Sequence, residues 1–346
     1  MPPSQDRPMF NPMTLLTRRP RHLPSERMAA LPHCSAGGIA SNESSNPPSL
    51  DSSIPVVDEI VVDEILGINL RNAIIAKYNP RHAIERARDK VAAKVALVEH
   101  GVKTSGTIAV VSGYGQLSSF DPEKILPDAW AIKPARGSQG DGILLAVRKE
   151  GRNWLKGSGK PITPDDVQNH VRRIVDGQFS GDAASDDAAL IEPLIIADPA
   201  FAFLVDDGLP DVRVICRGTI PLMAMARFPT NQSDGKANLH QGGIGAGVNL
   251  ETGVIFRAKQ GKKVITHHPD TGQKLIGFKV PHWKEVLDIA AHSGPAVGLG
   301  YCGVDIVHDV YEGPMVIEVN AHPGIEIQNT TLQGLRGRLI MAGEDC

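Results

Sequence analysis

The sequence predicts an α+β protein built around antiparallel sheets, and three stretches support this fold class. Near the end of the chain, two short β-runs at residues 303–308 and 314–320 are joined by a five-residue turn segment, as in a β-hairpin. Residues 81–100 carry apolar side chains at the three- and four-residue intervals of a helix. Residues 130–147 read as two strands around a glycine-rich loop. Hairpins together with separate helices are typical of an α+β chain.

Composition limits the class of protein. At 346 residues and 41% hydrophobic content, the chain can bury one large core or two ordinary cores. A net charge of −3 argues against electrostatic binding of nucleic acid. The four cysteines form no CxxC pair and are read as reduced thiols. No apolar run approaches the ~18–20 residues of a membrane span, so we expect a soluble, cytoplasmic protein.

Residues 1–53 differ from the rest of the chain because they are rich in Pro, Ser and Arg and lack an apolar period. Such a segment cannot bury enough surface to offset the entropy lost on ordering, so we expect it to be disordered. Four arginines between positions 18 and 27 suggest an organelle-targeting segment as an alternative. Pro20 and Pro24 would interrupt an amphipathic helix there.

The first ordered elements are expected to be helical. Residues 54–66 are apolar and acidic and could form a short helix, and a second helix is predicted over residues 81–100. The apolar stripe of this second helix consists of Ile84, Ala87, Val91, Val95 and Val98, and Gly101 stands at the C-terminal cap position. Lys90 and Lys94 flank the stripe one turn apart. The pattern alone leaves open whether they are surface lysines or a functional pair.

A glycine-rich loop at residues 135–142 follows a strand at 130–134 and precedes a strand at 143–147. Its backbone N–H groups could close over a phosphate, with Lys133 and Arg136 beside them. A common glycine-rich hairpin tip is the alternative. The loop is not a Walker motif, because no GK[ST] follows it. An earlier strand is expected at 107–112, and GYGQ at 113–116 is read as a turn.

Further elements are expected in this order: a helix after the capping Thr163, a polar loop at 177–187, a strand at 189–196, an antiparallel pair at 211–217 and 221–227, a glycine-rich loop at 238–247, a strand at 254–258, a helix at 283–297 disturbed at Gly294-Pro295, and a short tail at 332–346. Pro193 lacks the N–H that a central strand requires. Backbone groups beside it are therefore free to pair with a planar ring.

The hairpin at 303–320 carries the residues with the clearest chemistry. Side chains alternate across a strand, so Glu318 and Asn320 share one face, and folding of the hairpin brings Asp305 opposite them. Two carboxylates and an amide oxygen are hard ligands that suit Mg²⁺. The alternative is a surface aspartate, but facing carboxylates repel each other unless a cation lies between them. The hairpin therefore predicts a metal site.

These motifs together resemble the ATP-grasp superfamily. The resemblance rests on motifs that occur in the family's order: DKVAAK with Lys90, AIKP with Lys133 followed by GSQGDG, IEPLI with Glu192, DVRV at 211–214, and GVDIV with IEVN. NLHQGG and YNPR resemble the alpha-L-glutamate ligase-like branch. The resemblance covers about residues 65–335.

The resemblance implies an ATP-grasp fold in which two α+β lobes with antiparallel sheets sandwich ATP. The catalytic domain would span residues 54–335, with the glycine-rich lid in 54–188, a metal-binding lobe in 189–335 and a tail at 336–346. The chain departs from the family in one respect: such ligases commonly carry a substrate-binding domain ahead of the lysine-bearing segment, and we expect a full domain of this kind to be lacking here. The implied reaction is ATP-dependent ligation of a carboxylate to an amine or thiol through an acyl phosphate.

The resemblance also implies roles for single residues. The ATP-binding residues would be Lys90, Lys133, Gly137, Ser138, Gln139, Gly140, Gly142, Glu192, Leu194 and, at the ribose, Asp198. Asp305, Glu318 and Asn320 would hold Mg²⁺ as two ions, for which Mn²⁺ could substitute. Arg213 would stabilise the acyl phosphate and the oxyanion. The candidate substrate contacts are Arg227, Asn238 and His240.

Two other functions share the ATP-side residues: a catalytically silent ATP-binding subunit and a kinase-like phosphoryl transferase. Both substrates, the carboxylate and the amine acceptor, stay unidentified. Gln241 stands where the ribosomal-protein-modifying glutamate ligases have Arg, so the resemblance does not imply glutamate as the added amino acid. Because an acyl phosphate must be shielded from water, we expect a second copy or a partner protein to complete the site.

Overall fold

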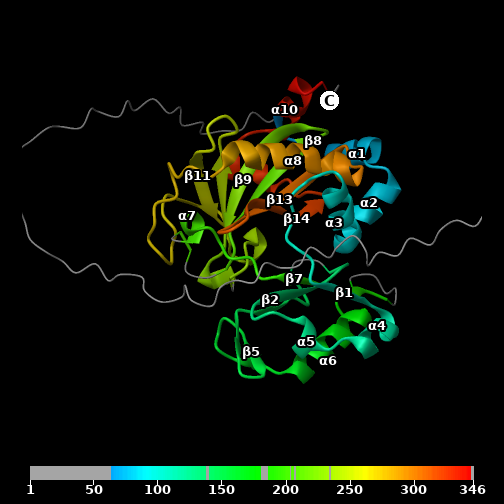
Figure 1. Ribbon diagram of the computed structural model, residues 1–346. Helices are drawn as coiled ribbons and strands as arrows, with labels where there is room; N and C mark the ends of the chain where they lie inside the picture. Colours follow the sequence, from blue (N-terminus) through cyan, green and yellow to red (C-terminus); the bar gives the residue numbers. More distant parts are fainter. Residues whose placement is uncertain are drawn as a thin grey trace, which may run out of the picture. The chain divides into compact units, whose positions relative to one another are not determined.

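The computed structural model describes residues 64–137, 140–180, 186–202, 204–205, 208–233 and 235–343 (Figure 1). The predicted disordered segment at residues 1–53 and most of the expected helix at 54–66 lie outside these residues. No helix in the described ranges is long and apolar enough to cross a membrane.

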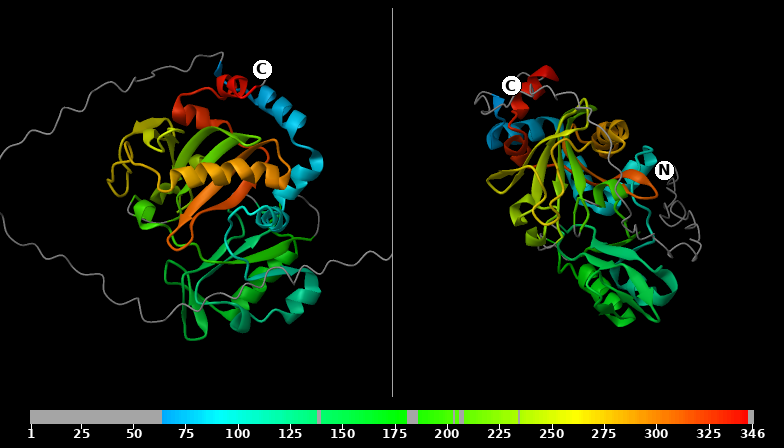
Figure 2. Two further views of the ribbon diagram at one scale, coloured as in Figure 1. Left: turned by 45° about the horizontal axis from the view of Figure 1, so that its top comes forward. Right: turned by 90° about the vertical axis from the view of Figure 1, so that its left-hand side faces the viewer.

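A seven-stranded antiparallel sheet forms the larger core, in the order β12-β11-β10-β9-β8-β13-β14. Its strands are β8 Asp211–Arg217, β9 Ile220–Phe228, β10 Ile244–Val248, β11 Ile255–Gln260, β12 Lys263–Ile265, β13 Tyr301–Asp309 and β14 Gly313–Asn320. Helix α8, Trp283–Val297, lies along one face (Figures 1 and 2). Alternate apolar residues of the strands, such as Val214, Ala226 and Val304, pack beneath it.

The opposite face of this sheet carries the charges. Register places Asp305 beside Arg213 on β8 and beside Glu318 on β14. The hairpins predicted at 303–320 and 211–227 are confirmed. Helix α8 runs through Gly294 and Pro295 without the predicted disturbance.

The glycine-rich loop predicted at 238–247 is wrong in its second half, where Ile244–Val248 forms strand β10. A Cβ at Gly245 would lie 2.8 Å from Thr330 Oγ1, and one at Gly247 would lie 3.0 Å from Thr331 Cγ2. These glycines therefore allow helix α9, Glu326–Thr331, to pack closely on the sheet. The first half contains a 3₁₀ turn, η4, Leu239–Gln241, and another turn, η3, spans Asn231–Ser233.

A four-stranded sheet in the order β1-β7-β2-β3 forms the second core. Its strands are β1 Ala109–Ser112, β7 Ala188–Pro193, β2 Trp130–Pro134 and β3 Leu144–Ala146. Apolar residues of α4, Gly113–Ser119, and α6, Pro164–Val175, pack on one face around Trp130 and Ile132. Thr163 caps α6 as predicted. The turn predicted at GYGQ is wrong because these residues begin α4, whose Leu117 is buried.

Short elements that the sequence did not predict join the second core. They are α5 Pro122–Ile125 and a three-stranded sheet of β4 Arg148–Glu150, β5 Asn153–Leu155 and β6 Pro161–Ile162. Helix α7, Pro199–Ala202, follows β7. Elements of two to four residues are too short to show a period in the sequence.

The helix predicted at 81–100 is two helices, α2 Arg81–Arg88 and α3 Lys90–Glu99. The break at Asp89 changes the buried face of α3. Val95 and Val98 of the predicted stripe are 40% and 49% exposed, whereas Ala93 and Leu97 are buried. The predicted apolar stripe is therefore wrong for α3.

The two ends of the described chain meet. Helix α1, Ile68–Tyr78, precedes α2, and helix α10, Leu335–Met341, occupies the expected tail. Gln328 Oε1 accepts hydrogen bonds of 2.9 Å from the backbone N–H groups of Leu66 and Leu335. Figure 2 shows the red α10 near the blue start of α1. The last residues thus contribute to the core, with Leu335 and Leu339 buried.

Candidate functional site

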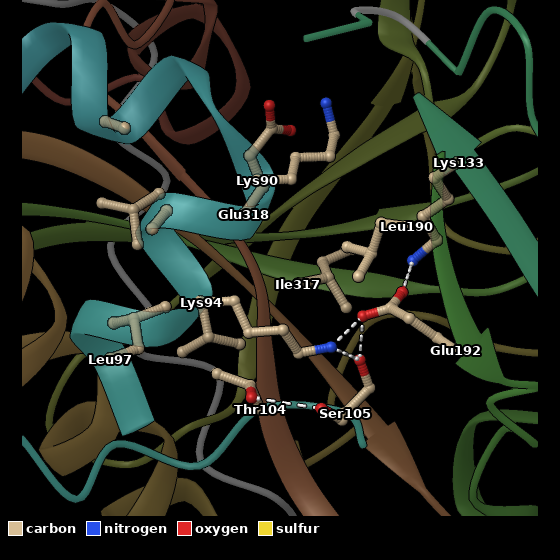
Figure 3. Close-up of a pocket in the computed structure, with 14 residues that line it drawn as sticks. Lys90, Lys94, Leu97, Thr104, Ser105, Lys133, Leu190, Glu192, Ile317 and Glu318 are labelled. Atoms are coloured by element: carbon tan, nitrogen blue, oxygen red, sulfur yellow. Dashed lines mark hydrogen bonds and ion pairs between the residues drawn. The ribbon is translucent and has the colours of Figure 1, made fainter. Parts of the chain in front are cut away.

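A pocket lies where α3, β2, β7 and β14 approach one another (Figure 3). Its lining holds the charged side chains Lys90, Lys94, Lys133, Glu192 and Glu318. Apolar residues such as Leu97, Leu190 and Ile317 form the remaining wall. The structure thus brings together four residues that were predicted from separate motifs and adds Lys94 to them.

Lys90 is fixed by the start of α3. The Asp89 carboxylate caps this helix by accepting from Val91 N and Ala92 N, each at 3.0 Å. The Lys90 ammonium donates to the carbonyl of Gly137 in the glycine loop. Burial lowers the pKa of Lys90, while the nearby carboxylate of Glu318 opposes that shift. Lys90 therefore joins the helix, the loop and the charged end of β14.

Glu192 lies between two lysines. Its Oε2 is 2.6 Å from Lys133 Nζ, and its Oε1 accepts from Lys94 Nζ and, at 2.5 Å, from Ser105 Oγ. Burial alone would raise the pKa of Glu192, but Lys133 and Lys94 bring it down to about 2. Lys94 is thus a buried pocket residue, and the alternative that it is a surface lysine is wrong.

The glycine loop is described at its glycines. Gly140 and Gly142 have positive φ angles of 76° and 72°, which side chains other than glycine rarely adopt. A Cβ at Gly142 would also lie 2.5 Å from the Phe179 ring. Ser138 and Gln139 lie outside the described residues. The binding of phosphate by these glycines and the role of the loop as a lid stay predictions.

The charged face of the large sheet holds a buried network of two acids and two arginines. Asp305 accepts from Arg213 Nε and Nη2 at 2.7 and 2.6 Å and from Arg227 Nη2 at 2.8 Å. Arg227 also donates to both oxygens of Asp211, at 2.6 and 2.7 Å. These are short hydrogen bonds, and the bidentate pairs are typical of a guanidinium and a carboxylate.

The network shifts the pKa values of the two acids, Asp305 and Asp211, in opposite directions. Burial would raise the pKa of Asp305, but Arg213 and Arg227 lower it to about 2. Burial, assisted by the neighbouring Asp305 charge, raises the pKa of Asp211 to about 6 against the pull of Arg227. Asp305 is therefore the ionised partner of Arg213 at neutral pH.

The predicted metal ligands fit Mg²⁺ by their chemistry. Asp305 and Glu318 are direct cross-strand neighbours, and Asn320 follows on the same face of β14. Each supplies an oxygen, and a carboxylate oxygen has lone pairs for an arginine and a cation together. No three His, Cys, Asp or Glu side chains in the described ranges form a candidate metal cluster. A metal here would therefore depend on the amide of Asn320 as well as on the two carboxylates.

Other predicted residues take part in local structure. Asp198 Oδ1 accepts from Ala200 N at 2.8 Å at the start of α7, and Asn238 Oδ1 accepts from His240 N at 3.0 Å. Leu194 is partly buried after β7, and His240 is exposed. None of these four residues lines the pocket that the described residues form. Their proposed contacts with ribose, adenine or substrate stay predictions.

Sequence reasoning left the role of Lys94 open and missed Ser105 and the structural role of Asp211. A signal for Lys94 was present, since it lies one helical turn after Lys90 and next to Ala93. No motif pointed to Ser105, because its contact with Glu192 joins segments 87 residues apart.

Comparisons with known proteins show the family to which the chain belongs. A family model described as sugar-transfer associated ATP-grasp matches residues 69–343. The chain therefore belongs to the sugar-transfer associated ATP-grasp family. This match confirms the resemblance to the ATP-grasp superfamily and the predicted α+β fold class.

Curated relatives carry the name probable alpha-L-glutamate ligase. The one from Maridesulfovibrio salexigens is 25% identical over 264 residues, which cover 76% of this chain and 65% of that protein. The one from Trichodesmium erythraeum is 26% identical over 266 residues, with the same coverage of 76% and 65%. The chain thus spans less than two thirds of the length of these relatives. They support the glutamate ligase-like branch.

Solved structures are more distant. A D-alanine–D-alanine ligase from Bacillus anthracis is 14% identical and superposes with a TM-score of 0.41, covering 79% of this chain and 70% of that chain. A D-cycloserine synthetase is also 14% identical, with a TM-score of 0.41 and coverage of 75% and 70%.

Proposed function

We propose that this protein is an ATP- and Mg²⁺-dependent ligase that joins a carboxylate to an amine through an acyl phosphate. The observation that carries the proposal is the placement of opposite charges in one region. Lys90 and Lys133 line the pocket from two elements, and Glu318, which lines the same pocket, is the cross-strand neighbour of Asp305. Cations suited to phosphates thus lie beside oxygen donors suited to a divalent metal.

Each residue has a defined task in this proposal. Lys90, Lys133 and the N–H groups of the glycine loop bind the phosphates of ATP, and the backbone after Glu192 meets the adenine. Asp305, Glu318 and Asn320 hold Mg²⁺, which when bound supplies neutralisation of phosphate charge.

The proposed chemistry has two steps. The substrate carboxylate attacks the γ-phosphorus, and the bond to ADP breaks, which gives an acyl phosphate and ADP. The amine then attacks the acyl carbon, loses a proton to solvent and expels phosphate as the amide forms. Arg213, fixed by Asp305, stabilises the oxyanion of the second step. No side-chain nucleophile is needed.

The name of the curated relatives, probable alpha-L-glutamate ligase, favours an amino acid as one of the two substrates. We propose that the amino acid is the amine and that a peptide or small molecule supplies the carboxylate. We therefore propose an acid–amino-acid ligase, without assigning glutamate, since Gln241 departs from the motif of the ribosomal-protein-modifying enzymes.

An ADP-release assay with a panel of carboxylates and amines tests the proposal. We expect ADP release that requires one member of each class. ADP release with a single substrate and a stable phosphorylated product would indicate a phosphoryl transferase instead. ATP binding without turnover across the panel would indicate a silent ATP-binding subunit.

A further inference from the structure

Lys94 occupies the inner wall of the pocket, one turn along α3 from Lys90 (Figure 3). Its side chain is 10% exposed and points toward Ser105 and Glu192. A buried ammonium is costly unless it is paired and hydrogen-bonded. A lysine at this position therefore needs specific partners that offset the free-energy cost of its burial.

The donors of Lys94 are fully used by protein groups. An ammonium has three N–H donors. Those of Lys94 are directed to Glu192 Oε1, to Ser105 Oγ at 3.0 Å and to the carbonyl of Gly106 at 3.1 Å. No donor is left for a phosphate, so Lys94 does not act as a third phosphate-binding lysine.

Lys133 differs from Lys94 in this respect. Its ammonium forms an ion pair with Glu192 Oε2 at 2.6 Å, and its side chain is 18% exposed on the pocket wall. Glu192 thus carries one negative charge between two lysines. If Lys94 remains with this carboxylate, Lys133 can leave it for a nucleotide phosphate without stranding a buried negative charge.

We propose that Lys94 is a positioning residue: it is the permanent counter-ion of Glu192, and it thereby frees the Lys133 ammonium to bind the phosphates of the nucleotide. The proposal rests on the proposed function, in which Lys133 binds ATP. It extends that function by assigning the two lysines around Glu192 different tasks. Ser105 contributes by accepting from Lys94 and donating to the same carboxylate oxygen.

Substitution of Lys94 has a distinct consequence in this scheme. In Lys94→Met, Lys133 becomes the sole cationic partner of the Glu192 side chain, and its transfer to a phosphate would leave a bare buried carboxylate. Binding of ADP should therefore weaken about ten- to a hundredfold, the effect expected for the loss of one charged hydrogen bond. Adenosine has no phosphate, so its binding should stay within about twofold.

Titration calorimetry of the full chain with ADP and adenosine tests the proposal in four proteins: wild type, Lys94→Met, Lys94→Met/Glu192→Gln and the control Lys124→Met. Lys124 lies on α5 with its side chain 81% exposed, so its variant should match the wild type. In the double variant the neutral Gln does not hold Lys133. Its ADP affinity should therefore be at least about threefold higher than that of Lys94→Met.

The outcomes are distinct. Unchanged ADP affinity in Lys94→Met, or equal losses for ADP and adenosine, would overturn the inference. If the single variant does not fold, the double variant decides: retained ADP binding supports the counter-ion role, and lost binding contradicts it. Failure of the wild type to bind ADP or ATP would instead overturn the proposed function, and this inference with it.

Discussion

At the scale of single residues, Asp305 and Glu318 differ in how much each contributes to the stability of the fold. Asp305 is buried and holds two arginines, whereas Glu318 is half-buried and lies near the ammonium of Lys90. Loss of Asp305 removes a structural partner as well as a proposed metal ligand. Loss of Glu318 removes chiefly a proposed ligand.

This difference predicts opposite profiles for two variants. Asp305→Ala should lower the free energy of unfolding by about 3–5 kcal/mol, because Arg213 and Arg227 lose a buried partner. Glu318→Gln with Asn320→Ala should change it by less than about 1 kcal/mol yet abolish turnover. Urea denaturation and ADP release measure the two effects. Undiminished ADP production by the double variant would contradict the metal assignment.

His308 predicts a pH dependence of stability. Its Nε2 lies 2.9 Å from the Pro281 carbonyl, its ring packs on Phe201, and burial lowers its pKa to about 4. A folded-state pKa below the unfolded value means that the unfolded chain binds the proton first as pH falls. The contribution of His308 to stability should therefore decrease from about pH 6.5 downward and level off below about pH 4, by about 3 kcal/mol in total.

The variant His308→Gln isolates this contribution, since glutamine does not titrate. Urea denaturation at about pH 7 and pH 5 should show a smaller loss of stability in the variant than in the wild type. Equal losses in both proteins would show that His308 is not the group responsible.

The residues that the sequence identified correctly belong to short motifs in which chemistry and spacing are local. Asp305 and Glu318 follow from strand alternation and the hairpin turn, and their pairing is confirmed. Lys94 could not be placed in this way. Its burial depends on Glu192 and Ser105, which other segments bring to it.

At the scale of elements, the break between α2 and α3 is the feature that sets the pocket wall. Asp89 ends one helix and caps the next, so Lys90 becomes the first residue of α3. The N–H of Lys90 also donates to Ala135 O at 2.9 Å, which joins this helix start to the glycine loop. A continuous helix would not offer that N–H.

Asp89→Ala should therefore have two effects. Loss of the cap should lower the free energy of unfolding by about 1 kcal/mol and should weaken ATP binding, because Lys90 loses its fixed start. Asp89→Asn should retain most of both properties, since asparagine caps helices equally well. Denaturation and calorimetry compare the variants. Equal ATP affinity in wild type and Asp89→Ala would separate the cap from the site.

The longer elements were predictable because each buries one regular face. Strands β8, β13 and β14 and helices α6 and α8 have strong periods, and their positions are confirmed. Strand β10 was predicted as a loop because Gly245 and Gly247 were read as turn residues. In the structure these glycines allow close contact with α9. Helices α1 and α10 were missed because they are buried where distant segments of the chain meet around Gln328.

At the scale of the whole molecule, the two chain segments that Gln328 joins each carry an exposed apolar side chain. Ile68 is 56% exposed on α1, and Met341 is 80% exposed on α10. Exposed apolar groups can favour association when a partner covers them. The prediction that a second copy or a partner protein completes the site is compatible with these two positions.

Light scattering of the purified protein tests this prediction. We expect a dimer or larger species in the wild type and a monomer in Ile68→Glu/Met341→Glu, because two charges oppose burial of these two positions in an interface. The control Val264→Glu alters an exposed valine on β12 and should not change the mass. A monomeric wild type with full ligase activity would contradict the prediction.

In the proposed reaction, a substrate carboxylate becomes an acyl phosphate before the amide forms. Transfer of ¹⁸O tests it most directly, with the carboxylate labelled at both oxygens and the released phosphate analysed by mass spectrometry. Attack of the carboxylate on the γ-phosphorus predicts one labelled oxygen in each phosphate, and the other in the amide. Amide formation with unlabelled phosphate, or with AMP in place of ADP, would contradict the account.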